Sequence, residues 1–175
     1  MNKIKIFDNF LEKELLNKII DQLCSDKTPW FHSLVDVRTT TYGITKNKNG
    51  YFRHTFYVDD EPNLPLYDFF IKNNLVKKLN CSTLISARAN LSLRDIDTIE
   101  SSYHVDYKFK NSKTAILYLT TCNAKTVFQL EGKEIPVESV KNRLVVFDTD
   151  VKHKIIYQTD KHKRYVINFN YYEGS

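Results

Sequence analysis

The sequence predicts a mostly β protein of the α+β class, in which N-terminal helices pack on one side of an antiparallel β-sandwich or barrel. Tyr and Phe number 11 each, whereas Gly and Pro number 4 each, and this composition favours strands joined by short turns. Helical hydrophobic spacing is confined to the stretch before residue 80, and short β-rich runs follow residue 82. Strands and helices do not alternate along the chain, which argues against a parallel sheet with crossover helices.

The first two expected elements are a short strand and an amphipathic helix. Polar and apolar residues alternate over 3–7, as in a half-buried strand. Asp8 or Asn9 is then a candidate N-cap for a helix that buries one face. The apolar residues of that face recur at helical spacing: Leu11, Leu15, Leu16, Ile19, Ile20 and Leu23.

Strand composition continues before a second expected helix. The stretches 35–42 and 51–58 are rich in Val, Thr, Tyr and Phe, and the turn-like sequence KNKNG lies between them. The second helix is expected to open near Asn63, with Pro65 in its first turn, and to end near Leu79.

Short β-rich runs separated by polar turns fill the chain from residue 83 onward. The Glu131-Gly132 pair between two of these runs predicts a tight hairpin, and hence antiparallel pairing. The runs cover 83–93, 114–121, 126–130, 134–137, 143–148, 154–158 and 163–172.

The whole-chain totals limit the class of protein. A chain of 175 residues with 42% hydrophobic residues suits one globular domain, so residues 1–175 are expected to form a single domain. The formal net charge is +5 and the pI is about 9.0. This charge allows an anionic substrate or nucleic acid. Because no long Lys/Arg block occurs, ordinary solvated lysines are the simpler explanation.

The cysteines and the apolar runs indicate the compartment. Cys24, Cys81 and Cys122 are scattered without CxxC spacing, which indicates neither a disulfide framework nor a zinc ribbon. The sequence contains neither a signal-peptide run nor a stretch long enough to span a bilayer. We therefore expect a cytoplasmic protein without a membrane partner.

The sequence YHVDYKF, residues 103–109, contains a candidate metal-binding pair. Side chains two apart on a strand point to the same face, so His104 and Asp106 can converge on one ion. Two histidines and one carboxylate with open coordination positions form the facial triad of non-haem Fe(II) sites. The alternative is a chance pair in a polar stretch, so the hypothesis needs a third ligand.

His153 is the best third ligand among the remaining histidines. It follows the run RLVVFD and precedes KIIYQ, at a strand entrance in the β-rich half. His162 lies in KHKR, which is typical of a solvated turn, and His32 and His54 fall before the second helix as core or surface residues.

Arg164 opens the last β-rich run, RYVINFNYY. Alternation places Arg164, Val166 and Asn168 on one face of that strand. A buried guanidinium needs an anionic partner, and its planar fork suits a carboxylate in bidentate fashion. That carboxylate belongs either to an Asp or Glu of the protein or to a ligand.

Four motifs in this order resemble the Fe(II)/2-oxoglutarate-dependent oxygenases, and within them the prolyl 4-hydroxylase-like branch. They are the HxD motif at 104–106, ILYL at 116–119, RLVVFD followed by His153, and RYVINFNYY. The resemblance covers about 83–172, which it implies to be a double-stranded β-helix, the jelly-roll or cupin-like core. Residues 1–80 would then supply helical support and substrate-side strands.

The resemblance implies a role for each candidate residue. The implied Fe(II) ligands are His104, Asp106 and His153. Arg164 would bind the distal carboxylate of 2-oxoglutarate, the hydroxyl of Tyr118 would touch the same carboxylate, and Asn168 would lie near the co-substrate. The alternatives are that Tyr118 is a core aromatic residue and that Asn168 has no part in the site.

Two departures from the family pattern affect this assignment. Members often carry a Gly-Gly pair after the ILYL-type strand, where this chain has Cys122 to Phe128 without glycine. Many prolyl hydroxylases also place a tyrosine on the strand before HxD, whereas SARANLSL has none. Arg88 and Asn90 are the candidate replacements.

The resemblance also implies the reaction and its partners. A family member hydroxylates a substrate C–H with O2 and 2-oxoglutarate, releases succinate and CO2, and uses ascorbate as a supporting reductant. Asp106 favours hydroxylation, because halogenating members lack this carboxylate. The implied substrate is a prolyl or other peptidyl residue. Alternatives are a nucleic acid undergoing oxidative demethylation or hydroxylation, a small molecule, or a non-catalytic metal-binding β-sandwich.

Overall fold

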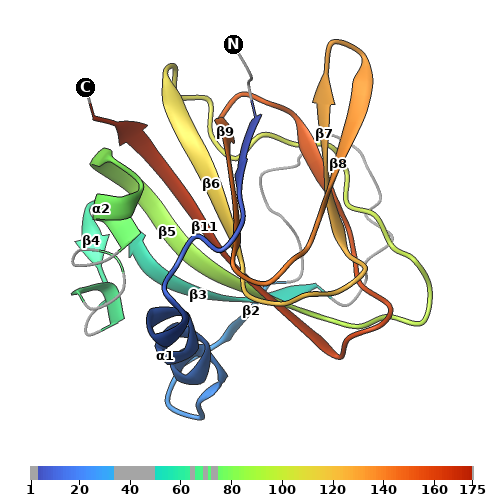
Figure 1. The fold of residues 1–175 in the computed structure, drawn as a ribbon, viewed down its shortest axis with the longest axis horizontal. Helices are drawn as coiled ribbons and strands as arrows, with labels where there is room; N and C mark the ends of the chain where they lie inside the picture. Colours follow the sequence, from blue (N-terminus) through green and yellow to red (C-terminus); the bar gives the residue numbers. More distant parts are fainter. Residues whose placement is uncertain (1–3, 34–49, 64–65, 69–70, 72–74, 175) are drawn as a thin grey trace.

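The computed structural model describes residues 4–33, 50–63, 66–68, 71 and 75–174, which form two antiparallel sheets (Figure 1). The main sheet has the order β1-β9-β6-β11-β5-β3-β2, with β4 paired to β3, and the small sheet has the order β10-β7-β8. The main-sheet strands are β1 (Ile4–Phe7), β2 (Phe31–Ser33), β3 (Tyr51–Val58), β4 (Glu61–Pro62), β5 (Cys81–Leu93), β6 (Ser112–Tyr118), β9 (Arg143–Asp148) and β11 (Lys163–Glu173). The small sheet contains β7 (Lys125–Leu130), β8 (Lys133–Glu138) and β10 (His153–Ile156), and the helices are α1 (Lys13–Cys24) and α2 (Val76–Lys78).

The small sheet lies across one face of the main sheet, which we call the inner face (Figure 1). A buried apolar cluster fills the space between the sheets and joins Ile116 and Tyr118 of β6 with Val166 of β11, and with Phe128 of β7 and Val137 of β8. These two facing antiparallel sheets confirm the expected mostly β sandwich.

The opposite face of the main sheet carries a second core. Ile167 and Phe169 alternate with Val166 along β11, and both are fully buried. They belong to one cluster with three apolar residues of α1, namely Leu16, Ile19 and Leu23. Burying such side chains stabilises the fold by roughly 1.5–3 kcal/mol each relative to exposure. The two alternating cores fix which residues of β11 face the interior between the sheets.

The start of α1 differs from the sequence prediction. Its N-cap is Glu12, without a side-chain cap, and neither Asp8 nor Asn9 caps it. The carboxylate of Asp8 instead accepts a bond from Arg143 at 2.6 Å, which draws it toward β9. Asn142 donates to and accepts from the backbone of Leu11 at 2.8 and 2.9 Å. Contacts with residues at the start of β9 therefore fix the chain before the helix. Because these residues are distant in the sequence, no local sequence pattern indicates the contacts.

The other expected strands are confirmed where the structure describes them. Glu131 and Gly132 have φ values of +50° and +76° and form the turn between β7 and β8. The second helix, expected over 63–79, is represented by α2 near its end, while 64–65, 69–70 and 72–74 lie outside the described residues. The expected strand at 35–42 also lies outside them. No helix in the described part of the chain is long and apolar enough to cross a membrane.

Candidate metal centre and co-substrate site

The structure brings His104, Asp106 and His153 together. Their candidate ligand atoms all lie within 4.8 Å of one another. The Nε2 atoms of His104 and His153 each lie 3.9 Å from Oδ1 of Asp106, and the two imidazole centroids are 4.5 Å apart. Two imidazole nitrogens and a carboxylate oxygen thus converge, which is the donor set of a facial triad.

A backbone bridge between distant segments positions this cluster. His104 and His153 form an isolated antiparallel bridge with two N–H···O=C bonds of 2.9 Å. Contrary to the sequence expectation, 103–109 is not a regular strand, because Asp106 lies in a bend beyond the bridge. The bend, and not strand alternation, turns the carboxylate toward the imidazoles.

Both imidazoles are oriented by backbone carbonyls. Nδ1 of His104 lies 3.1 Å from the carbonyl oxygen of Ser102, and Nδ1 of His153 lies 3.1 Å from that of Val151. Because a carbonyl oxygen only accepts, each Nδ1 carries the proton and donates it. The Nε2 lone pairs then point to the centre of the cluster, which is the outer-shell arrangement typical of metal-ligating histidines.

The two sides of the cluster differ in solvent access. His153 is 2% exposed, and its ring lies 5.0 Å from that of Phe147 and 5.9 Å from that of Phe128. The side chains of His104 and Asp106 retain 15% and 16% exposure. The site therefore has an apolar inner wall and opens to solvent on the side of the HxD motif.

Arg164 and Tyr118 form a second buried group on the inner face. The guanidinium carbon of Arg164 lies 5.5 Å from the Tyr118 ring centroid, and its Nε donates to Oγ of Ser139 at 3.3 Å. Arg164 is only 3% exposed, yet within the described part of the chain no carboxylate pairs with it. Burial raises the pKa of the Tyr118 phenol, while Arg164 and the Thr126 hydroxyl partly oppose this rise. The pair thus places a buried cation beside a neutral hydroxyl.

The Arg164–Tyr118 pair and the cluster of His104, Asp106 and His153 face the same interior between the sheets. The hydroxyl of Tyr118 donates to Oγ1 of Thr126 at 2.7 Å. Thr126 lies two residues before Phe128 on β7, and Phe128 pairs directly with His153 of β10. Two residues of strand advance the chain by roughly 7 Å. The Tyr118 hydroxyl therefore lies about one strand repeat from the level of His153.

Asn168 and the candidates for the missing tyrosine also face this interior. Asn168 lies between Ile116 of β6 and Arg88 of β5 in the sheet register, and its Oδ1 is buried without a hydrogen-bond partner. Asn90 lies directly opposite Val166. Arg88 donates to the hydroxyl of Tyr107 at 2.9 Å. All three polar residues thus occupy inner-face positions of the main sheet.

The sequence did not predict the two hydroxyls that accept hydrogen bonds from Tyr118 and Arg164. Thr126 accepts from Tyr118, and Ser139 accepts from Arg164. The alternation of TVFQL could have placed Thr126 on the face of Phe128, but nothing local marked Ser139. The hydroxyl of Thr114, in contrast, bonds to Thr149 and Asn170 at 3.1 and 2.8 Å, within the protein.

The other histidines with described surroundings lie apart from the cluster. Nδ1 of His54 lies 2.9 Å from the carbonyl oxygen of Pro29, and the ring lies 4.9 Å from that of Phe56 in the outer core. His162 is exposed before β11, as the sequence predicts. His32 is exposed on β2, beside the ring of Phe52 at 5.0 Å.

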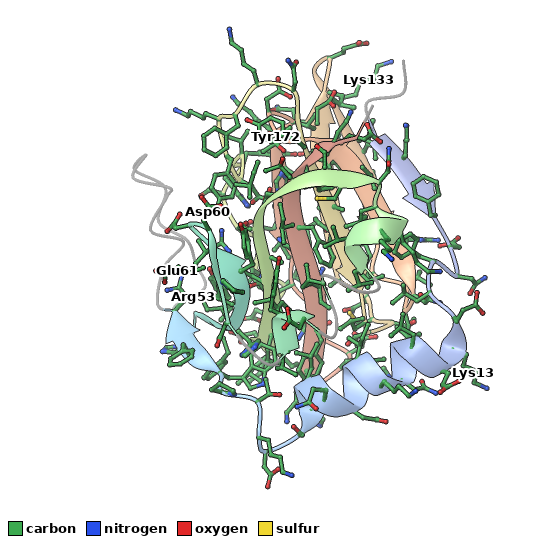
Figure 2. The ribbon with its side chains drawn as sticks, turned by 90° about the vertical axis from the view of Figure 1, so that its left-hand side faces the viewer. Lys13, Arg53, Asp60, Glu61, Lys133 and Tyr172 are labelled. Atoms are coloured by element: carbon green, nitrogen blue, oxygen red, sulfur yellow. The ribbon has the colours of Figure 1, made fainter. Side chains whose placement is uncertain are left out.

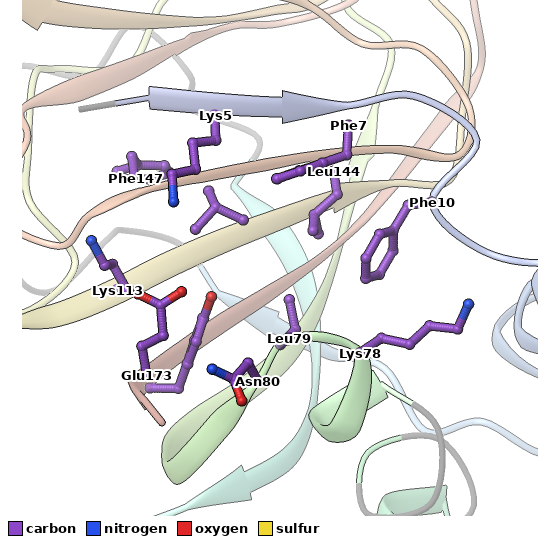
Figure 3. A pocket seen from close by; sticks show the side chains of 12 residues that line it. Lys5, Phe7, Phe10, Lys78, Leu79, Asn80, Lys113, Leu144, Phe147 and Glu173 are labelled. Atoms are coloured by element: carbon purple, nitrogen blue, oxygen red, sulfur yellow. The ribbon is translucent and has the colours of Figure 1, made fainter. Parts of the chain in front are cut away.

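A hollow of about 190 Å³ lies elsewhere on the molecule, near the end of α2 (Figure 3). It is lined by apolar side chains such as Phe10 and Leu144 and by the lysines Lys5, Lys78 and Lys113. No member of the metal cluster lines it. This hollow is therefore separate from the candidate site.

No family model matches the chain, and no curated protein matches its sequence. Solved structures, in contrast, match over nearly its whole length. A prolyl hydroxylase from Trichoplax adhaerens, in complex with a hypoxia inducible factor oxygen degradation domain peptide fragment, has a TM-score of 0.69 at 14% identity, covering 99% of this chain and 84% of that chain. A 2OG-Fe(II) oxygenase family oxidoreductase from Burkholderia pseudomallei has a TM-score of 0.72 at 11% identity, with coverages of 97% and 85%. A prolyl-4-hydroxylase from Pseudomonas putida has a TM-score of 0.61 at 14% identity, with coverages of 98% and 94%.

The chain therefore has the fold of the 2OG-Fe(II) oxygenases, including prolyl hydroxylases. This likeness confirms, at the level of fold, the resemblance and the jelly-roll core predicted from the sequence.

Proposed function

We propose that the protein is an Fe(II)- and 2-oxoglutarate-dependent dioxygenase that hydroxylates a C–H bond of its substrate, with residues 1–175 forming one oxygenase domain. The observation that carries the proposal is the convergence of His104, Asp106 and His153, whose candidate ligand atoms lie within 4.8 Å of one another. The comparisons support it through the fold alone.

The side chains fit a resident divalent iron. Both Nδ1–H groups are held by backbone carbonyls at 3.1 Å, so the rings offer Nε2 without rotating. When bound, Fe(II) with O2 and 2-oxoglutarate supplies the oxidising chemistry, which yields succinate, CO2 and a hydroxylated product. The chain contributes three ligands that leave coordination positions open, and the rings of Phe128 and Phe147 exclude water behind His153.

Arg164 and Tyr118 would bind the distal carboxylate of 2-oxoglutarate. The Arg164 guanidinium is buried without a protein carboxylate among the described residues, so an anionic ligand would compensate its charge. The neutral phenol of Tyr118 can accept from the guanidinium, or can donate its one proton to the carboxylate in place of Thr126. A five-carbon dicarboxylate is long enough to span the one strand repeat, roughly 7 Å, between the Tyr118 hydroxyl and the level of His153. Asn168 would offer its amide beside the co-substrate.

A peptidyl residue, such as a prolyl ring, is the proposed substrate. One structural neighbour is a prolyl hydroxylase with a peptide fragment bound, and another is a prolyl-4-hydroxylase. The open side of the metal cluster, at His104 and Asp106, is where a substrate could approach.

A substrate panel tests this proposal. The purified protein is supplied with Fe(II), ascorbate and 2-oxoglutarate, and challenged with proline-containing peptides and with methylated oligonucleotides. We expect a peptide to raise succinate release above the level without substrate and to gain the mass of one oxygen atom. Stimulation by oligonucleotides alone, with loss of a methyl group, would replace the peptidyl substrate with nucleic acid.

A further inference from the structure

Two arginines lie on neighbouring strands beside the candidate site. Arg53 of β3 pairs with Asn90 of β5, and Arg88 lies two residues before Asn90. Directly paired residues of an antiparallel sheet point to the same face, as do residues two apart on a strand. Diagonal neighbours of this kind approach to roughly 7–8 Å between their backbones, within reach of long side chains. Arg53 and Arg88 therefore form a pair on one face of the sheet. Of the two, Arg53 is labelled in Figure 2.

That face is the inner face. Asn90 pairs with Val166, which belongs to the apolar cluster between the sheets, and Arg88 pairs with Asn168. The alternate residues His54 and Ala89 pair with each other on the opposite face, where Ala89 belongs to the outer core. The arginine pair thus shares a face with the residues proposed to hold the co-substrate.

Arg88 is also tied to the metal cluster. Its Nη2 donates to the hydroxyl of Tyr107 at 2.9 Å, and its guanidinium carbon lies 6.0 Å from the centroid of that ring. Tyr107 directly follows Asp106, the carboxylate of the cluster. The arginine pair therefore lies next to the open side of the site, where a substrate would enter.

Neither arginine has an acidic partner among the described residues. Arg53 is exposed, and the bond to Tyr107 is the only hydrogen bond of the Arg88 guanidinium there. Other cations of this chain do find carboxylates: Arg143 pairs with Asp8 at 2.6 Å, and Lys154 pairs with Glu100 at 2.9 Å. Two arginines at diagonal positions on one face of a sheet, with no carboxylate partner among the described residues, suit the binding of an anionic group.

We propose that Arg53 and Arg88 bind a carboxylate of the substrate and so select acidic substrates for oxidation. This proposal rests on the oxygenase function above, whose substrate class it names. The carboxylate would be held by the two guanidinium forks while the C–H bond to be oxidised lies over the metal cluster. Its source is either an acidic side chain of a peptide or a small carboxylic acid.

The surrounding charges favour a single carboxylate over a polyanion. The turn that leaves β3 carries Asp59 and Asp60, and the segment that leads from β5 to His104 carries Asp95 and Asp97. A nucleic-acid backbone that extended from Arg53 along β3, or from Arg88 along β5, would reach these carboxylates and be repelled. A monoanionic group between the two arginines would not require such an approach.

Binding to matched ligands tests the proposal. The probes are fluorescein-labelled decapeptides with a central proline that differ at one position, Glu, Gln or Lys, and a labelled single-stranded decanucleotide. Fluorescence anisotropy is measured with and without saturating 2-oxoglutarate. Because 2-oxoglutarate then occupies Arg164, peptide binding that remains in its presence does not involve a carboxylate at Arg164. The α-amides of N-acetylglutamate and N-acetylglutamine, which differ only in carrying one carboxylate or none, serve as unlabelled competitors for the small-acid source.

The variants separate charge from folding. Charge-assisted hydrogen bonds of this kind predict that the Glu peptide binds about tenfold or more tightly than the Gln peptide. Arg88→Gln should remove most of this preference, and Arg53→Glu, at an exposed position, should reverse it toward the Lys peptide. Lys13→Gln in α1, on the other side of the sheet, should leave it unchanged. Competition by the N-acetylglutamate amide alone would support a small acid as the source of the carboxylate. If this amide does not compete, the source is an acidic side chain of a peptide.

Equal affinity for the Glu and Gln peptides would overturn the proposal, as would an unchanged preference in Arg53→Glu or tighter binding of the decanucleotide. Binding is measured without turnover, so these outcomes are independent of oxygenase activity. A Glu preference in a protein that forms no succinate would leave the arginine pair in place and contradict the oxygenase function instead.

Discussion

The guanidinium group of Arg164 lies over the ring of Tyr118, with 5.5 Å between the guanidinium carbon and the ring centroid. Arg164 is 3% exposed and Tyr118 is fully buried, so this cation sits deep between the sheets. The hydroxyl of Ser139 is its only described hydrogen-bond partner. A buried cation without a carboxylate is costly, and a dicarboxylate ligand offsets that cost.

Replacing Arg164 should therefore weaken 2-oxoglutarate binding selectively. Hydrogen bonds to charged groups contribute about 1.5–3 kcal/mol, so Arg164→Met should raise the Kd for 2-oxoglutarate roughly 10- to 100-fold. Calorimetric titration of the Mn(II)-loaded protein measures this Kd and, separately, that for the metal. Arg143→Met, which removes an arginine paired with Asp8 at the surface, is the control and should change neither. If Arg164→Met lowers the affinities for metal and for 2-oxoglutarate equally, Arg164 has a structural role and does not bind the co-substrate.

The buried phenol of Tyr118 should make the fold sensitive to alkali. Burial raises its folded-state pKa above the ordinary value of 10.0. The stabilisation is present below the unfolded-state pKa and is lost as the pH rises through the folded-state value, because the unfolded chain releases the proton first. We expect the free energy of unfolding to fall less steeply with pH above about 10 in Tyr118→Phe than in the wild type. Urea denaturation across this range measures the slope, and identical slopes would contradict the assignment.

The outer core should depend strongly on α1. Ile19 is fully buried in the cluster that contains Ile167 and Phe169. Ile19→Ala should lower the free energy of unfolding by about 2–5 kcal/mol, because it leaves a cavity as well as removing apolar contacts. Ile6→Ala on β1, where the side chain is 48% exposed, is the matched control and should stay within about 0.5 kcal/mol of the wild type. Equal effects in denaturant titrations would place α1 off the sheet.

The three cysteines should react at different rates. Cys24 is exposed and Cys122 is buried. Burial raises the pKa of the Cys81 thiol to about 11, so little thiolate forms there near neutral pH. Iodoacetamide should therefore alkylate Cys24 first, as read by peptide mass spectrometry, and Cys24→Ser should react slowly throughout. Alkylation of Cys81 as fast as Cys24 would contradict its place in the fold.

The sequence predicted those parts of the fold that local pattern determines. The alternation along β11 correctly separated Val166 from Ile167, which now lie in the inner and outer cores. The Glu131-Gly132 turn was visible because positive φ at two successive residues suits this pair. His153 was placed at a strand entrance, which is where β10 begins.

Features set by distant residues were not predictable from local sequence. Asp8 looked like a helix cap, but its carboxylate is taken by Arg143, 135 residues away. Strand alternation correctly suggested that His104 and Asp106 converge, although a bend beyond the bridge to His153 is what aims the carboxylate. Ser139 contacts Arg164 only in the folded chain, so no local sequence motif could have predicted this hydrogen bond.

Uncoupled turnover of 2-oxoglutarate tests the central claim most directly. The measurement is succinate formed by the purified protein with Fe(II), ascorbate and O2, compared between the wild type, His153→Ala and the exposed-turn control His162→Ala. The account predicts iron-dependent succinate formation in the wild type and the control, and its loss in His153→Ala, because that change removes one of three metal ligands. Iron-dependent succinate formation that survives in His153→Ala, or none in a folded wild type, would contradict the account.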